Sequence, residues 1–211
     1  MNEINPKIII ITGSIGTGKS AASKIIKKYG FSVLDSDEIV HEGYKPDNDL
    51  HKKVVECFGE EILNEFGEID RQKLGKIVFY DEQKLNKLNG IVHSFVVHEL
   101  IKGVEECLNK SKNAVFLDIP LFFEGKDNLI KYGLRYDEVW LVYVNSSLQR
   151  ERLKKRAVIE NKNVEDVLNI IKKQIPIENK KTISHEIIYN EGTLEEFNNT
   201  IENLLKKKGL I

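Results

Sequence analysis

The sequence contains little cysteine. Its 211 residues include only two, Cys57 and Cys107. Neither has a second cysteine or a histidine at the spacing used by zinc sites, and one distant pair is not a disulfide framework. We therefore expect no zinc site and no disulfide scaffold, but two reduced, buried thiols.

The sequence also lacks an excess of either charge. It has 32 basic and 33 acidic residues, for a formal net charge of -1. Proteins that bind nucleic acid through its phosphates usually carry a basic surplus, because they must displace the counterions. The composition argues against nucleic acid as a partner.

No long apolar run is present. No segment approaches the roughly 20 apolar residues that a membrane-spanning helix needs. The first residues, MNEINPKIIIITG, have neither a basic start nor the apolar stretch of a secretory signal. Repeats, low-complexity tracts and Pro- or Ser-rich linkers are also lacking, so we expect a single unit in the cytoplasm, with no membrane partner.

Short apolar segments alternate with helical periodicities along the chain. The apolar segments contain hydrophobic residues at successive positions, as buried parallel strands do. The predicted strands are residues 8–12, 32–34 (the weakest), 114–117, 139–144 and 187–189. The clearest predicted helices are residues 21–29, 148–156, 164–174 and 194–207. This order predicts an α/β fold with a five-stranded parallel sheet covered by helices on both faces.

Two segments interrupt the alternation. Between the second and third strands the pattern is almost wholly helical, with predicted turns at Gly59, Gly67 and Gly90. We interpret residues 36–112 as a helical insertion. Residues 150–163 are rich in arginine and lysine; on charge alone, a solvated helix face explains them.

The sequence Gly-Ser-Ile-Gly-Thr-Gly-Lys-Ser, residues 13 to 20, lies between the first predicted strand and the first predicted helix. It matches Gly-x-x-x-x-Gly-Lys-Ser, the P-loop, in the strand–loop–helix context that this motif requires. Backbone N–H groups that wrap a phosphate need conformations and close approaches that a Cβ obstructs, which favours glycine. The Gly-x-Gly-x-x-Gly spacing of dinucleotide folds is not matched, which disfavours a nicotinamide or flavin oxidoreductase.

The loop predicts binding of a nucleoside triphosphate together with Mg²⁺. The helix that follows directs its positive end at the same phosphates. Lys19 can reach the β- and γ-phosphates, and the Ser20 hydroxyl can ligate magnesium. The expected ATP-binding residues of the loop are Ser14, Ile15, Gly16, Thr17, Gly18, Lys19, Ser20 and Ala21.

Carboxylates follow two of the predicted strands. Asp35 and Asp37 follow the second, at the strand end where open α/β sheets bind ligands. Either can accept a proton from an attacking hydroxyl, sit near magnesium, or cap the next helix. Asp118 follows the third and could hold magnesium through water. We find no guanine-reading Asn/Thr-Lys-x-Asp element, which disfavours a switch GTPase.

Taken together, several segments resemble the dephospho-coenzyme A kinase family. They cover nearly the whole chain: ITGSIGTGKS (11–20), LDSDEIVHE (34–42), FGEEILNEFGEIDRQKLGKIVF (58–79), LNGIVH (88–93), LDIPLFFE (117–124), VWLVYVNSSLQRERLKKR (139–156), Gln174, Lys180 and IIYNEG (187–192). The chain departs from the family pattern at Ser14, Thr17, Ser94, Ser184 and His185. None of these departures removes a phosphate-binding or catalytic group.

The resemblance implies ATP-dependent phosphorylation of the ribose 3′-hydroxyl of dephospho-coenzyme A, the final step of coenzyme A synthesis. It also implies a P-loop core (residues 1–35, 113–149 and 164–211), a substrate-binding insertion (36–112) and a small lid (150–163). By the same likeness Asp37 is the catalytic base, assisted by Lys19 and by Arg156 of the lid, where Arg152 and Arg156 would close over ATP.

The resemblance further implies that dephospho-coenzyme A is bound by Asp37, Arg71, His93, Pro120, Leu121 and Glu124. Structural roles stay open: Arg71 could pair with a carboxylate at a helix end, and His93 could be a packed core residue. Another P-loop kinase of the nucleoside monophosphate, shikimate or gluconate type is the alternative, as is a regulatory nucleotide-binding module. We expect a monomer or a small homo-oligomer.

Overall fold

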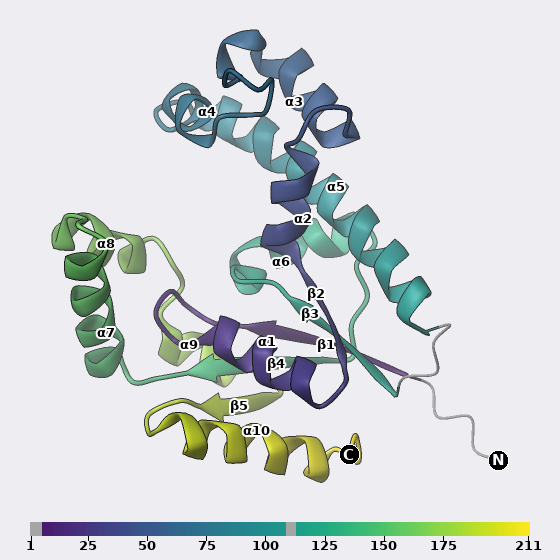
Figure 1. Ribbon diagram of the computed structural model, residues 1–211, viewed down its shortest axis with the longest axis vertical. Coiled ribbons are helices and arrows are strands. Elements are labelled where there is room, and N and C mark those ends of the chain that lie inside the picture. The colour runs from purple at the N-terminus through teal and green to yellow at the C-terminus, as the bar shows by residue number, and fades with distance from the viewer. Residues whose placement is uncertain (1–5, 109–112) are drawn as a thin grey trace. The chain divides into compact units, whose positions relative to one another are not determined.

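A computed structural model of the chain describes residues 6–108 and 113–211 (Figure 1). The chain divides into two compact units. The sheet unit holds the described residues up to Leu34, together with Val104–Lys126 and Arg135–Ile211. The helical unit holds Asp35–Gly103 and Asp127–Leu134.

The sheet unit is built on five strands. They are β1 (Lys7–Thr12), β2 (Ser32–Asp35), β3 (Ala114–Asp118), β4 (Glu138–Tyr143) and β5 (Glu186–Tyr189), in the order β2-β3-β1-β4-β5. β1 pairs in parallel with both β3 and β4, and β4 pairs in parallel with β5. The predicted parallel α/β sheet is confirmed, including its weakest strand. The register sets Ile11 beside Asp118, so the end of β1 and the end of β3 are neighbours.

Within residues 6–108 and 113–211, six helices accompany these strands. They are α1 (Lys19–Lys28), α6 (Phe122–Lys131), α7 (Ser146–Ile159), α8 (Val164–Lys172), α9 (Ile177–Thr182) and α10 (Leu194–Lys207). α1 and α10 pack on one face of the sheet, where Ile26, Phe197 and Ile201 join a core with Ile9, Phe116 and Trp140. α9 contributes Ile177 to a second cluster with Leu141 and Tyr143.

Four of these helices follow the sequence prediction closely. α10 has the predicted bounds, and a capping box between Thr193 and Glu196 sets its start. α7 begins at Ser146, two residues before the prediction, because Asn145 accepts a hydrogen bond from Leu148 N–H at 2.9 Å and caps it. Residues 150–163 lie within α7 and the turn before α8; their role as a lid stays a prediction.

The helical unit has its own core. It comprises α2 (Ser36–Gly43), α3 (Asp49–Phe58), a 3₁₀ turn (Glu60–Ile62), α4 (Arg71–Val78) and most of α5 (Glu82–Leu108). The core gathers Leu50, Val54, Phe58, Ile62 and Leu74 from these elements, and Ile69 from the segment before α4. Gly59 and Gly67 lie in turns with φ of 85° and 75°. The predicted turn at Gly90 is wrong, because Gly90 lies inside α5, where a glycine costs a helix only about 1 kcal/mol.

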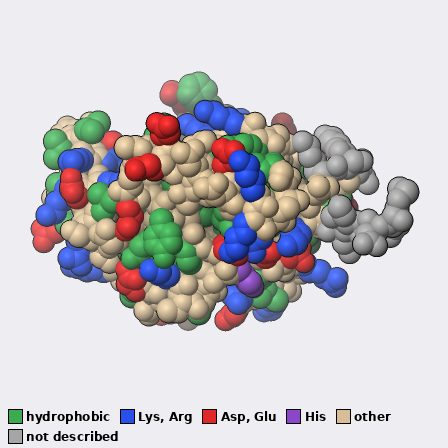
Figure 2. All heavy atoms as spheres, turned by 90° about the horizontal axis from the view of Figure 1, so that it is seen from below, with side chains coloured by type: hydrophobic (Ala, Val, Ile, Leu, Met, Phe, Trp, Pro, Cys, Tyr) green, Lys and Arg blue, Asp and Glu red, His purple; other side chains and the backbone are tan. Residues whose placement is uncertain are grey.

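Acidic and basic side chains are interspersed on the face drawn in Figure 2. Ion pairs within the described chain include Lys206 with Glu202 and Lys207 with Glu186. None of the described helices has the length and apolar character required to cross a bilayer.

Candidate active site

The phosphate loop connects β1 to α1. Gly16 has φ of 83°, and Gly18, the N-cap residue of α1, has φ of 92°. Side chains other than glycine rarely adopt these left-handed conformations. At Gly13 the need is space instead, since a Cβ would lie 2.5 Å from Thr17 Oγ1 and 3.1 Å from the Val142 carbonyl. The three glycines therefore allow a tight loop that leads directly into a helix N-terminus.

Side chains around the loop hold its shape. Thr17 donates its hydroxyl to the Ser14 carbonyl at 2.9 Å, and Asn190 donates its amide to the Thr17 carbonyl at 2.8 Å. A Cβ at Gly18 would collide with the Asn190 amide. Ser14 is buried, and its Oγ has no partner among the described residues. No local sequence pattern pointed to Asn190 by itself, because its contact with the loop joins positions 173 residues apart.

Lys19 and Asp118 form an ion pair beside this loop. Lys19 is the first residue of α1, and Asp118 is the last residue of β3. Asp118 is 1% exposed, and its second oxygen accepts a hydrogen bond from Ser23 Oγ at 2.6 Å. The structure thus brings together Lys19 and Asp118, two residues that the sequence analysis predicted for the site. It adds Ser23, which the sequence analysis did not predict. Ser20 lies exposed at the second position of α1.

Asp35 and Asp37 differ in their local roles. Asp35 is the N-cap of α2, and its Oδ1 accepts hydrogen bonds from the N–H groups of Asp37 at 2.8 Å and Glu38 at 3.3 Å. Asp37 is exposed in the first turn of that helix. The capping role that the sequence left open for either residue therefore belongs to Asp35.

Arg71 and His93 lie in the helical unit. Arg71 is exposed at the start of α4, with its guanidinium carbon 5.4 Å from the centre of the Tyr44 ring. No carboxylate within residues 6–108 and 113–211 forms an ion pair with Arg71, so pairing at a helix end does not explain it. His93 is half-buried in α5; burial lowers its pKa, and its Nδ1 has no partner in the described part of the chain. The imidazole is therefore held neutral near pH 7.

The segment after β3 contains Pro120, Leu121 and Glu124, the remaining residues predicted to bind the phosphoryl acceptor. Thr12 Oγ1 donates to the Pro120 carbonyl at 3.0 Å, and the Leu121 side chain is 47% exposed. Glu124 Oε1 lies 2.7 Å from Lys180 Nζ and accepts the Ile175 N–H at 3.0 Å. Lys180 is fully buried. Sequence reasoning gave Lys180 no role of its own, since a lysine is normally placed at the surface.

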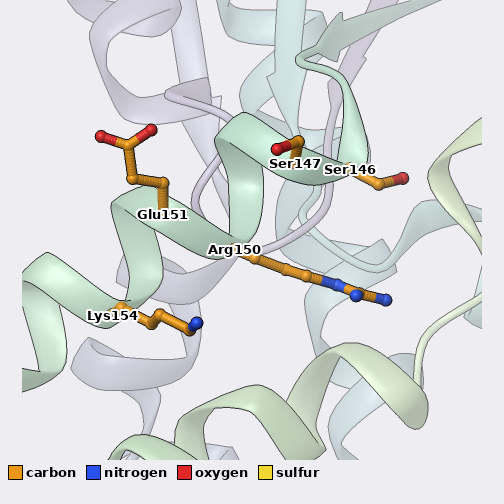
Figure 3. Close-up of a pocket in the computed structure, with 5 residues that line it drawn as sticks. All are labelled: Ser146, Ser147, Arg150, Glu151 and Lys154. Carbon is orange, nitrogen blue, oxygen red and sulfur yellow. The ribbon is translucent and has the colours of Figure 1, made fainter.

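The arginines of α7 lie at the surface of the sheet unit. Arg152 is half-buried, and Arg156 pairs with Glu160 at 2.5 Å along the same helix. Neither lines the hollow of about 530 Å³ at the start of α7, which is lined by Ser146, Ser147, Arg150, Glu151 and Lys154. Arg150 and Lys154 extend from one side of the helix, away from Glu151 (Figure 3).

Comparisons with known proteins agree on one family. A family model described as dephospho-CoA kinase matches residues 7–196. A dephospho-CoA kinase of Carboxydothermus hydrogenoformans is 38% identical over 95% of this chain and 93% of its own length. The corresponding protein of Staphylococcus aureus is 35% identical over 98% of this chain and 95% of its own.

Solved structures agree with the fold. A crystal structure from Thermus thermophilus has a TM-score of 0.77 at 28% identity and covers 96% of this chain and 97% of that one. A dephospho-CoA kinase from Campylobacter jejuni has a TM-score of 0.67 at 26% identity, covering 97% and 98%. The resemblance stated from the sequence is confirmed.

Proposed function

Because the chain belongs to the dephospho-CoA kinase family, we propose that it transfers the γ-phosphoryl group of ATP to the ribose 3′-hydroxyl of dephospho-coenzyme A. The products are coenzyme A and ADP. The observation that carries the proposal is the phosphate loop with Lys19 at its exit, in a chain that matches the family over residues 7–196. In the transfer, the bond from the γ-phosphorus to the β–γ bridging oxygen breaks and a bond to the ribose oxygen forms.

The loop and the first turn of α1 bind the phosphates. The N–H groups of Gly16, Gly18, Lys19 and Ser20 donate no hydrogen bond within the described chain, and so remain available to an anion. The positive end of α1 favours the same negative charge. On ATP binding, Lys19 exchanges part of its interaction with Asp118 for the β- and γ-phosphates, where its charge opposes the charge that develops during transfer.

Ser20 and Asp118 would hold magnesium. A hydroxyl and a carboxylate are oxygen donors of the kind Mg²⁺ prefers, and this ion commonly keeps several waters with one or two carboxylates and the substrate phosphates. Among the described residues, no three His, Cys, Asp or Glu side chains gather into a metal site. A magnesium ion held here would therefore need ligands from water and the phosphates as well. When bound, the ion neutralises phosphate charge.

Asp37 is the base. Its carboxylate takes the proton of the ribose 3′-hydroxyl while that oxygen attacks the γ-phosphorus. Asp35, by capping α2, fixes the first turn from which Asp37 projects. Arg71, His93, Pro120, Leu121 and Glu124 bind dephospho-coenzyme A. Arg152 and Arg156 act on ATP.

An acceptor screen tests the proposal. Purified protein with ATP and magnesium is given dephospho-coenzyme A, shikimate, gluconate and nucleoside monophosphates, and ADP release is followed. We expect kcat/KM for dephospho-coenzyme A to exceed that for every other acceptor by at least about a hundredfold, since correct acceptor binding positions the hydroxyl in line. Comparable rates with another acceptor would show that the protein is a P-loop kinase for that acceptor. An absence of turnover with every acceptor would favour a regulatory module that binds nucleotide without catalysis.

A further inference from the structure

Ile15, in the phosphate loop, has both of its backbone polar groups bound by glutamine side chains. Gln149 Nε2 donates to the Ile15 carbonyl at 2.7 Å, and the Ile15 N–H donates to Gln174 Oε1 at 3.3 Å. Gln149 belongs to α7, and Gln174 follows the end of α8. Gln149 is only 2% exposed, so water cannot readily replace this hydrogen bond to its amide.

The same two helices also pack on the loop through apolar contacts. The Ile15 side chain packs against a cluster formed by Leu153 and Ala157 of α7 and Val167 of α8. At the next residue, a Cβ on Gly16 would lie only 3.0 Å from Leu153 Cγ. Figure 1 shows α7 and α8 side by side, which agrees with their shared cluster. The loop is thus attached to this helix pair at two consecutive residues.

The hydrogen bonds of the loop determine which of its N–H groups are available to bind a phosphate. The Ile15 N–H is taken by Gln174, and the Thr17 N–H is taken by the Ser14 carbonyl at 3.2 Å. The peptide groups of Ile15 cannot rotate without breaking a glutamine contact. The amides of Gly16 and of the residues from Gly18 to Ser20, which make no such bonds in the described chain, are held in one arrangement as a result.

We propose that Gln149 and Gln174 are positioning residues for phosphate binding. They hold the two peptide groups on either side of Ile15, so that the amides that follow are preorganised for the triphosphate, and they make the affinity for ATP depend on the position of the α7–α8 pair. This inference rests on the proposed function, because it takes ATP as the ligand. Neither glutamine needs to contact the nucleotide.

The test replaces each amide while keeping its volume. Gln149→Met and Gln174→Met each remove one hydrogen bond, and Gln174→Glu retains an acceptor for the Ile15 N–H. Gln83→Met, at an exposed site of α5, is the matched control. Calorimetric Kd values are measured for ATP and for inorganic tripolyphosphate, with KM for ATP and for dephospho-coenzyme A.

We expect each methionine variant to weaken ATP and tripolyphosphate about five- to tenfold, as one lost hydrogen bond does. KM for dephospho-coenzyme A should stay within about twofold. Gln174→Glu should recover part of the tripolyphosphate affinity relative to Gln174→Met, because it restores the acceptor while its negative charge repels the anion. The double variant should lose less than the product of the two single losses, since both bonds hold the same loop residue, Ile15. A merely structural role would instead raise the KM of both substrates alike and would not be rescued by glutamate.

Two failures are distinguishable. If the unaltered protein binds neither ATP nor tripolyphosphate, the proposed function is wrong. If it binds both and the methionine variants match it within about twofold, only the positioning role is overturned. Gln174 is half-buried, so its variants keep the test decisive if Gln149→Met does not fold.

Discussion

At the scale of single residues, Asp35 and Asp37 are of the same type but occupy different environments. The Asp35 carboxylate accepts hydrogen bonds from two backbone N–H groups of α2, whereas Asp37 is exposed in the first helical turn. The sequence pattern Asp-x-Asp could not separate the two roles, because both positions suit an N-cap. The cap hydrogen bonds separate them.

Asparagine at these two positions should therefore act differently. Asp37→Asn removes the proposed base, so we expect kcat to fall by about 10²- to 10⁴-fold while Kd for ATP is unchanged. Asp35→Asn is the matched control, since asparagine caps helices about as well as aspartate, and its kcat should fall far less. Steady-state kinetics and calorimetry supply both readouts. Turnover of Asp37→Asn equal to that of the unaltered protein would remove the residue from the chemistry.

The ion pair between Glu124 and Lys180 is asymmetric. Lys180 is wholly buried, whereas the Glu124 side chain is 20% exposed. Removing one partner of a buried pair is costly because it strands the other charge. We expect Glu124→Gln, which strands the lysine, to cost about 3 kcal/mol of unfolding free energy, and Lys180→Met to cost clearly less. Urea denaturation gives both values, and the reverse order would show that burial does not set the cost.

At the scale of elements, the strands were the most predictable part. β3 and β4 are buried at every position, so their continuous apolar runs mark them in the sequence. The helices α6 and α9 were not predicted. α9 has only six residues, too few for periodicity to show, and α6 contains Gly125. Local sequence patterns did not assign roles to Lys180 and Asn190, because these residues contact Glu124 and Thr17, which lie far away in the sequence.

Two glycines of the helical unit allow a test in which one substitution has opposite effects. Gly75 lies inside α4, and a Cβ there would meet nothing within 4 Å. Gly67 also has room, but its φ is 75°. Gly75→Ala should raise the free energy of unfolding by about 0.5–1 kcal/mol through helix propensity. Gly67→Ala should lower it by about 1 kcal/mol, because alanine is strained in the left-handed region.

Denaturation followed by far-ultraviolet circular dichroism measures both changes. Steric room is similar at the two sites, so a difference in sign reports the backbone conformation alone. Destabilisation by Gly75→Ala would mean that α4 does not hold that residue in a helix.

At the scale of the whole molecule, one charge cluster joins the beginning and the end of the sheet unit. Glu138, at the start of β4, accepts Lys7 Nζ at 2.9 Å and Trp140 Nε1 at 2.9 Å, and pairs with Lys208 at 2.7 Å. Lys7 starts β1, and Lys208 follows α10. Burial alone would raise the pKa of Glu138, but the hydrogen bonds from Lys208, Trp140 and Lys7 outweigh it and lower the pKa to about 2.

This lowered pKa predicts how stability depends on pH. In the unfolded chain the carboxyl titrates near its model value of 4.5, so its contribution is fully present above that pH and is lost as the pH falls toward 2. Trp140 is the single tryptophan and is fully buried, so its fluorescence reports unfolding of this unit. Urea midpoints measured between about pH 5 and pH 2 should fall steeply for the unaltered protein.

Glu138→Gln should lower stability at pH 7, because it leaves Lys208 without one of its carboxylates, and it should flatten the fall in acid. Glu42→Gln, in an exposed pair with Lys45, is the control and should leave the urea midpoint almost unchanged. If Glu138→Gln loses stability in acid as steeply as the unaltered protein, other carboxylates govern that transition. The cluster would then join β1, β4 and the chain end without controlling their response to pH.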